Sequence, residues 1–167
     1  MAIFIFEAIV ITIIYTIMLI NAMKRNPLAF IDHYPKAIVE RLNKLGLLAC
    51  NKPRNKFKYI LTKIIKSLFI ACFITCLIIF INDVSNFKEG FIIAYGLWFI
   101  ITWFDVLVID GLWFRKDYSI RIKGSEDMEE AYNDLSFHII RSIEASIIGL
   151  GFAAVVGAMV EFVNIFI

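Results

Sequence analysis

Four runs of apolar residues, each long enough to cross a membrane, constrain this chain more than any other feature. The runs cover residues 2–23, 62–81, 91–112 and 139–167. About 20 apolar residues in an α-helix span the hydrocarbon core of a bilayer. A soluble domain of this length has too small an interior for 60% hydrophobic residues, 16 of them Phe. We therefore predict an all-α integral membrane protein, a four-transmembrane-helix bundle that forms a single membrane domain over residues 1–167.

Positive charge is distributed unevenly between the loops that join these runs. Of the 17 Lys and Arg residues, eleven lie within residues 24–66 and five within 115–141, whereas the loop 82–90 holds only Lys88. Short loops rich in Lys and Arg stay in the cytoplasm during membrane insertion. We therefore expect a multi-pass protein with both its N- and C-termini outside the cytoplasm. Its expected partners are membrane lipids, including anionic headgroups, and no nucleic acid.

The first cytoplasmic segment has the pattern of an amphipathic helix over about residues 35–49. Apolar residues recur at helical spacing, and charged residues lie largely opposite them. The apolar positions are Ile38, Leu42, Leu45 and Ala49. We predict an interfacial helix on the inner membrane surface, with its apolar side in the lipid.

The second cytoplasmic segment has a helix-start pattern at Ser125, followed by acidic residues. A serine side chain can cap free backbone N–H groups, and acids in the first turn oppose the positive end of the helix dipole. Since no Pro or Gly occurs within residues 126–148, we predict a helix that starts at about residue 125. It would run without a break into the fourth span, which thereby extends into the cytoplasm.

Small residues recur every fourth position along the fourth run, at Ala145, Gly149, Ala153 and Gly157. Such a ridge lets another helix backbone approach closely in lipid. We predict that the ridge packs against a second helix. That helix belongs either to the same chain or to a second protomer, in a homodimer formed through the fourth helix.

Ionisable residues inside the spans indicate a candidate pocket, because each costs a few kcal/mol in the bilayer unless it is paired or hydrated. Five of them fall at similar depth towards the cytoplasm: Asp105, Asp110, His138, Arg141 and Glu144. Three polar residues beyond the first span are placed to close this pocket: Asn26, Asp32 and His33. We predict a ligand or proton pocket. The alternative is a structural ion pair between Arg141 and one of the two aspartates.

The spacing of the two aspartates limits this pocket. In an ideal α-helix, residues five apart point about 140° away from each other. Asp105 and Asp110 would then not both face one ligand. A separate pair of carboxylates, Glu7 and Glu161, lies towards the outer ends of the first and fourth spans. These two are candidates to share a proton, bind a cation or contact the outer water.

The sequence leaves the function open between three classes. No His or Cys spacing typical of a metal site occurs, so we predict no metal, and no cofactor is indicated. The first class is transport of an ion or small polar solute by an oligomer, with the pocket as the binding site. The second is a membrane-embedded enzyme acting on a lipid or lipid-linked substrate, with His138 or His33 as acid/base and Arg141 holding an anionic group. The third is a non-catalytic accessory or scaffold subunit.

Overall fold

The computed structural model describes residues 2–48 and 56–166, which form helices and connecting turns. Four helical segments are long and apolar enough to cross a membrane: Ala2–Arg25, Phe57–Phe80, Phe87–Phe114 and Glu129–Asn164. The prediction of an all-α, multi-pass membrane protein with four spans is confirmed at this level. The last position of the predicted interfacial helix, Ala49, lies outside the described residues, as does Ile167 at the end of the fourth span.

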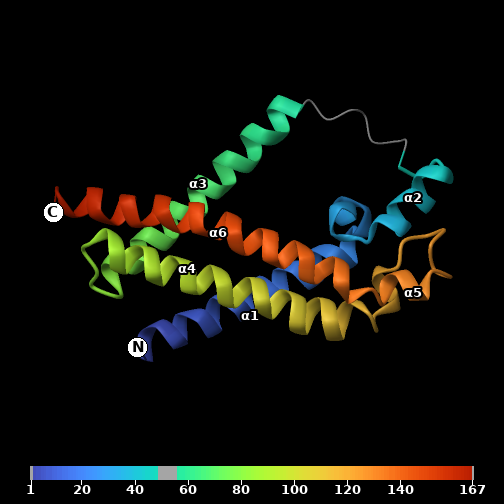
Figure 1. Cartoon of the computed structure of the whole chain (residues 1–167), viewed down its shortest axis with the longest axis horizontal. Coiled ribbons are helices and arrows are strands. Elements are labelled where there is room, and N and C mark those ends of the chain that lie inside the picture. Colours follow the sequence, from blue (N-terminus) through green and yellow to red (C-terminus); the bar gives the residue numbers. More distant parts are fainter. Residues whose placement is uncertain (1, 49–55, 167) are drawn as a thin grey trace. The chain divides into compact units, whose positions relative to one another are not determined.

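The helices follow one another in a simple order along the chain (Figure 1). Their bounds are α1 Ala2–Arg25, η1 Pro27–His33, α2 Lys36–Lys44, α3 Lys56–Phe80, α4 Phe87–Phe104, η2 Asp105–Phe114, η3 Tyr118–Ile120, α5 Glu129–Tyr132 and α6 Leu135–Asn164. Here η1 and η3 are 3₁₀-helices, whereas η2 is a π-helix.

Large apolar side chains cover the outside of the spans. Phe6 in α1 is 69% exposed, Phe69 in α3 is 77% exposed and Phe162 in α6 is 62% exposed. Contiguous apolar surface of this kind is rare on soluble monomers and is expected where lipid replaces water. The surplus of apolar residues in the sequence is therefore accounted for by the surface of the helices rather than by an interior.

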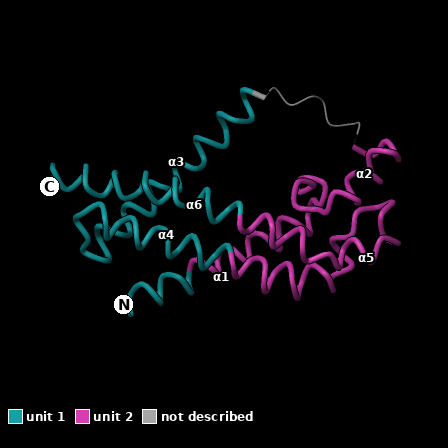
Figure 2. The backbone as a smooth tube through the Cα atoms, viewed as in Figure 1, with its two compact units in different colours: residues 1–10, 54–102, 144–167 teal, residues 11–53, 103–143 magenta. Residues whose placement is uncertain are grey.

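Internal contacts divide the chain into two compact units (Figure 2). Unit 1 comprises residues 1–10, 54–102 and 144–167, and unit 2 comprises residues 11–53 and 103–143. The prediction of a single membrane domain stays a prediction.

In unit 1 the small-residue ridge of α6 packs against α4 of the same chain. A Cβ added at Gly149 would overlap the indole of Trp98, and one at Gly157 would lie 2.8 Å from the backbone oxygen of Phe87. Ala153 is fully buried. The indole Nε1 of Trp98 donates a hydrogen bond to the carbonyl of Ala145 at 2.9 Å. The predicted packing role of the ridge thus has an intrachain partner, and a homodimer through the fourth helix stays a prediction.

In unit 2 the amphipathic helix α2 packs onto protein rather than lipid. Ile38 and Leu42 are fully buried, in one cluster with Tyr34, Ile120 and Tyr132. The Tyr34 hydroxyl fixes this arrangement by donating to the Ile120 carbonyl at 2.8 Å. The prediction that the apolar side of this helix lies in the membrane surface is therefore wrong for its two central positions. An amphipathic stripe indicates an apolar neighbour without saying whether it is protein or lipid.

The predicted continuous helix from residue 125 is also wrong. Ser125 is fully buried, and its hydroxyl donates to the Ile122 carbonyl and contacts the Tyr132 hydroxyl at 2.8 Å. It is therefore part of a packed turn instead of a helix cap. The helix begins later, at α5, and breaks before α6, where the Asp134 carboxylate accepts hydrogen bonds from the backbone N–H and the hydroxyl of Ser136. Aspartate favours such local capping over a continuing helix.

Candidate functional site

Four polar side chains from three helices of unit 2 form what we call the polar cluster. They are Tyr15 of α1, Asp105 and Asp110 of η2, and His138 of α6. All four belong to segments that are long and apolar enough to span a membrane. Polar groups at such depth are costly and are commonly functional.

The imidazole of His138 is held by Asp110. Its Nδ1 lies 2.8 Å from Asp110 Oδ2, and only 6% of the His138 side chain is exposed. The rings of Phe114 and Phe137 lie edge-on to the imidazole, each with its centroid at 5.2 Å. A carboxylate partner assigns the Nδ1 proton and leaves Nε2 of the neutral ring as an acceptor. This Nε2 is buried and has no hydrogen-bond partner among the described residues.

The carboxylate of Asp105 is the second incompletely satisfied group of the polar cluster. The Tyr15 hydroxyl donates to its Oδ2 over a long 3.4 Å contact. Its Oδ1 is buried without a hydrogen-bond partner in the described part of the chain. Asp105 also lies within electrostatic range of both Asp110 and His138. An unsatisfied buried polar group costs about 1–3 kcal/mol, and such groups call for an explanation.

The π-helical form of η2 explains how two aspartates five residues apart act on one site. Backbone hydrogen bonds of a π-helix join residues five apart, so Asp105 and Asp110 lie closer to one face than an α-helix allows. The limit that we derived from ideal α-helical spacing is therefore overturned by the local structure. Gly111 lies in this helix, where an added Cβ would come within 3.2 Å of the Val106 carbonyl. Single π-helical turns occur frequently at functional sites.

Arg141 does not form the structural ion pair that we considered as the alternative. Among the described residues, no salt bridge joins it to Asp105 or Asp110, and Asp110 pairs with His138 instead. The guanidinium lies 5.6 Å from the ring centroid of Phe137 on the same helix. Arg141 thus lies three residues after His138 on α6, beside an aromatic ring of the same helix.

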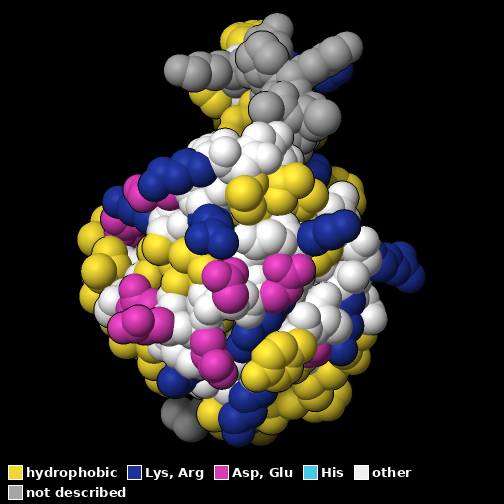
Figure 3. All heavy atoms as spheres, turned by 90° about the vertical axis from the view of Figure 1, so that its right-hand side faces the viewer, with side chains coloured by type: hydrophobic (Ala, Val, Ile, Leu, Met, Phe, Trp, Pro, Cys, Tyr) yellow, Lys and Arg dark blue, Asp and Glu magenta, His cyan; other side chains and the backbone are white. Residues whose placement is uncertain are grey.

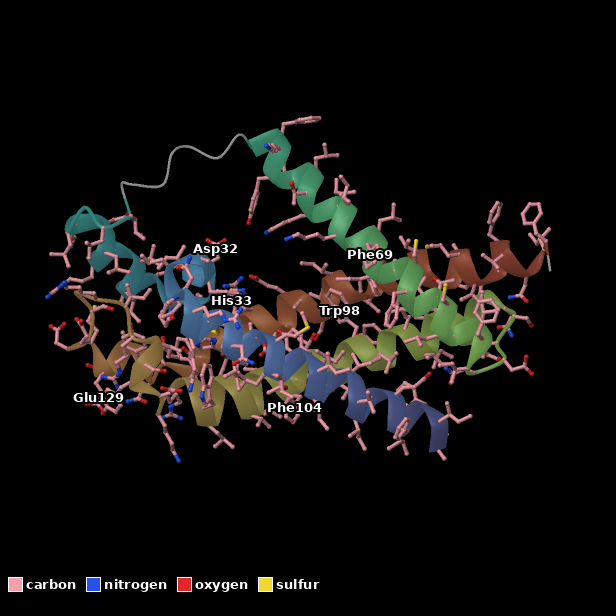
Figure 4. All side chains as sticks on the ribbon, turned by 180° about the vertical axis from the view of Figure 1, so that it is seen from behind. Asp32, His33, Phe69, Trp98, Phe104 and Glu129 are labelled. Carbon is pink, nitrogen blue, oxygen red and sulfur yellow. The ribbon has the colours of Figure 1, made fainter. Side chains whose placement is uncertain are left out.

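His33 is electrostatically linked to the polar cluster, and it is exposed, as are its two predicted companions Asp32 and Asn26. Figure 4 shows Asp32 and His33 on η1. The pKa of His33 is lowered, first because neighbouring protein atoms partly exclude water from the imidazole and then because Arg141 is positively charged. The negative charge of Asp110 partly opposes this shift by raising the pKa. Asp32 is exposed, and the exposed Asn26 caps η1 by accepting a hydrogen bond from the Ala29 N–H at 3.3 Å. Asn26 therefore has a structural explanation.

Three predicted site residues belong to unit 1. Glu144 is exposed on α6. Glu7 is buried, and both of its carboxylate oxygens accept hydrogen bonds from the side-chain amide of Asn82, at 3.0 and 2.9 Å. Glu161 is exposed. The described contacts of Glu7 are thus with Asn82, and a shared proton between Glu7 and Glu161 stays a prediction.

Sequence reasoning missed Tyr15 and Thr12 of α1. Thr12 is buried, and its hydroxyl has no hydrogen-bond partner in the ranges described. The two residues are three positions apart and so lie on one face of the helix. This spacing of polar residues in a run of aliphatic ones is a signal that could have found them.

The chemistry of the polar cluster is that of proton and hydrogen-bond exchange. In the described ranges, no three His, Cys, Asp or Glu side chains are arranged so that they could hold a metal ion. The cluster instead combines an imidazole held by one carboxylate, a second carboxylate and a phenol. Together these groups can accept protons or hydrogen bonds from a small ligand.

Comparisons with protein-family models, with curated proteins and with solved structures each find no match for this chain.

Proposed function

We propose that this multi-pass membrane protein binds a small ion or polar solute at the polar cluster and, as an oligomer, transports it across the membrane. The observation that carries the proposal is a pair of buried acceptor atoms, Asp105 Oδ1 and His138 Nε2, which have no hydrogen-bond partner among the described residues. A cation, proton or donor group bound at either atom would satisfy it and remove the cost of burying it unpaired.

The site faces the cytoplasm in this proposal. Residues 24–66 and 115–141, which comprise two loops and the adjoining ends of the spans, hold 16 of the 17 Lys and Arg residues. This distribution supports an orientation with both termini outside. Oligomerisation is part of the proposal because transporters usually enclose their site between two repeats of several helices. Four spans in one chain are few for such an arrangement.

One observation favours a second candidate, a membrane-embedded enzyme that acts on a lipid or lipid-linked substrate. The His138–Asp110 pair, with a free Nε2, has the form of a general base oriented by a carboxylate. An enzyme would convert its substrate without moving an ion across the bilayer. A scaffold subunit, the third class, would tolerate changes in the polar cluster and lose its partner when the acidic segment 126–130 is changed.

Flux measurements with the purified full chain in liposomes test the proposal. Protons, Na⁺, K⁺ and ammonium are each offered as a gradient. We expect at least one of them to move faster than in protein-free liposomes, and Asp105→Asn and His138→Gln each to lower this rate by about tenfold or more. Asp127→Asn, which changes a carboxylate with 68% exposure, is the matched control and should have no effect. Folding of each variant is checked by thermal unfolding in detergent.

Three outcomes would contradict transport at this site. The first is the absence of flux for all four probes in well-folded protein. The second is a flux that the two cluster variants leave unchanged. The third is conversion of a membrane lipid extract that depends on His138 while the liposomes remain impermeable, which would favour the enzyme.

A further inference from the structure

A groove at the end of two spans is a second candidate binding region, separate from the polar cluster. The groove has a volume of about 430 Å³, within the range of small-molecule sites. One wall is apolar and is made by Gly111 and Leu112 of η2. Leu112 is 57% exposed, as expected for a side chain that contacts lipid. The other wall is polar and comes from residues that follow this span or start the next one.

The polar wall carries more positive than negative charge. Arg115 and Lys116 are exposed, and Arg115 Nε donates to Asn133 Oδ1 at 3.2 Å, which orients the guanidinium. One carboxylate, Glu129, also lines the groove. It lies 3.9 Å from the guanidinium of Arg121, which compensates its charge. Arg121 is 6% exposed and packs over the Tyr118 ring at 3.9 Å from its centroid.

The position of the groove along the chain matches the boundary between membrane and water. Leu112 belongs to the span Phe87–Phe114, Arg115 and Lys116 follow directly, and Glu129 begins the last span. Figure 3 looks onto the face where α2 and α5 lie and shows acidic and basic side chains interspersed over it. Basic residues next to an apolar wall at this level suit a phosphate with acyl chains attached.

We propose that this groove binds the headgroup of one anionic phospholipid of the cytoplasmic leaflet. Arg115 and Lys116 hold the phosphate, Asn133 keeps Arg115 in place, and the acyl chains lie along Leu112. Arginine suits this task because its planar donors match phosphate oxygens, and lysine adds a compact charge. This proposal does not depend on transport at the polar cluster.

Native mass spectrometry of the full chain in a nonionic detergent tests the proposal. Phosphatidylglycerol and phosphatidylcholine with identical acyl chains are added in turn. We expect one phosphatidylglycerol to be retained per chain, with at least tenfold preference over phosphatidylcholine. Arg115→Ala combined with Lys116→Ala should lower the affinity for phosphatidylglycerol on the order of tenfold. The matched control, Lys36→Ala combined with Lys44→Ala, removes the same charge from exposed positions of α2 and should have little effect.

Each alternative gives its own result. Equal losses in the two double variants would show diffuse attraction to the basic surface and would overturn the groove. Lack of preference for phosphatidylglycerol in the wild type would overturn it as well, and this measurement needs no variant to fold. Displacement of the lipid by millimolar inorganic phosphate would identify a site for a free anion in place of a lipid.

Discussion

His138 Nδ1 lies 2.8 Å from Asp110 Oδ2, and this contact joins α6 to η2 inside two apolar spans. The pair orients the imidazole so that the other nitrogen is available to a ligand. Asp110 is thus a positioning residue for His138. The same contact also contributes to stability, since an imidazole without it would be buried with neither nitrogen paired.

Asp110→Ala should therefore lower stability by about 1–3 kcal/mol, the cost of leaving a buried polar group unsatisfied. Asp110→Asn keeps an acceptor oxygen and should cost less. Thermal unfolding in detergent, followed by circular dichroism, measures both. Asp127→Ala is the control because its carboxylate is exposed and its contact with Arg41 is 3.5 Å long. Equal losses of stability for Asp110→Ala and Asp127→Ala would show that the buried His138–Asp110 pair stabilises the protein no more than an exposed carboxylate does.

The sequence predicted the four spans well because lipid-facing helices need only length and apolar side chains, and both can be read directly. It also brought Asp105, Asp110 and His138 together as one candidate site. The two aspartates were judged to point apart because the sequence carries no evident signal for the π-helix of η2. Similarly, the stripe of Ile38 and Leu42 indicated a buried face, but its protein partner, the segment around Ile120, depends on tertiary packing.

Alanine substitution at two glycines of α6, Gly149 in the ridge and Gly151 outside it, should change the stability of the protein differently. Gly149→Ala should destabilise the protein, because the added Cβ would overlap the Trp98 indole, which also donates a hydrogen bond to the Ala145 carbonyl. Moving the ring breaks that hydrogen bond and disturbs the packing, which should lower the free energy of unfolding by about 1–3 kcal/mol. Gly151→Ala meets no atom within 4 Å and should be neutral or stabilising by up to about 1 kcal/mol. Thermal unfolding compares the two, and a larger loss for Gly151→Ala would contradict this packing.

The turn before α5 depends on one buried phenol. The Tyr132 hydroxyl accepts from the Ile122 N–H at 3.0 Å and contacts the Ser125 hydroxyl at 2.8 Å. Tyr132→Phe leaves this buried N–H unsatisfied and should cost about 1–3 kcal/mol in the unfolding free energy. Tyr118→Phe is the matched control, since Tyr118 is 66% exposed. If the two variants unfold alike, the hydroxyl of Tyr132 does not stabilise the turn.

Asp117 makes part of the stability depend on pH. Hydrogen bonds from Ser119, and then from Lys24, lower the pKa of Asp117 from its ordinary 3.8 to about 2. Since the folded pKa is below the unfolded one, the stabilisation is complete above about pH 4 and is lost as the pH falls towards 2. Asp117→Asn keeps an acceptor for the Ser119 N–H but removes the charge that pairs with Lys24. It should therefore lower the free energy of unfolding at about pH 6 by up to about 1 kcal/mol. The gap between wild type and variant should close near pH 2, and a gap independent of pH would refute this role.

The orientation of the chain is the prediction on which both binding proposals depend. A variant without the three native cysteines receives one new cysteine, either at Ser85 in the loop 82–90 or at Lys123 in the basic segment. Both positions are exposed. Because positive charge is retained in the cytoplasm, a thiol reagent that cannot cross membranes should label position 85 in intact cells and position 123 only after lysis. Labelling of position 123 in intact cells would reverse the topology, and the lipid of the groove would then belong to the outer leaflet.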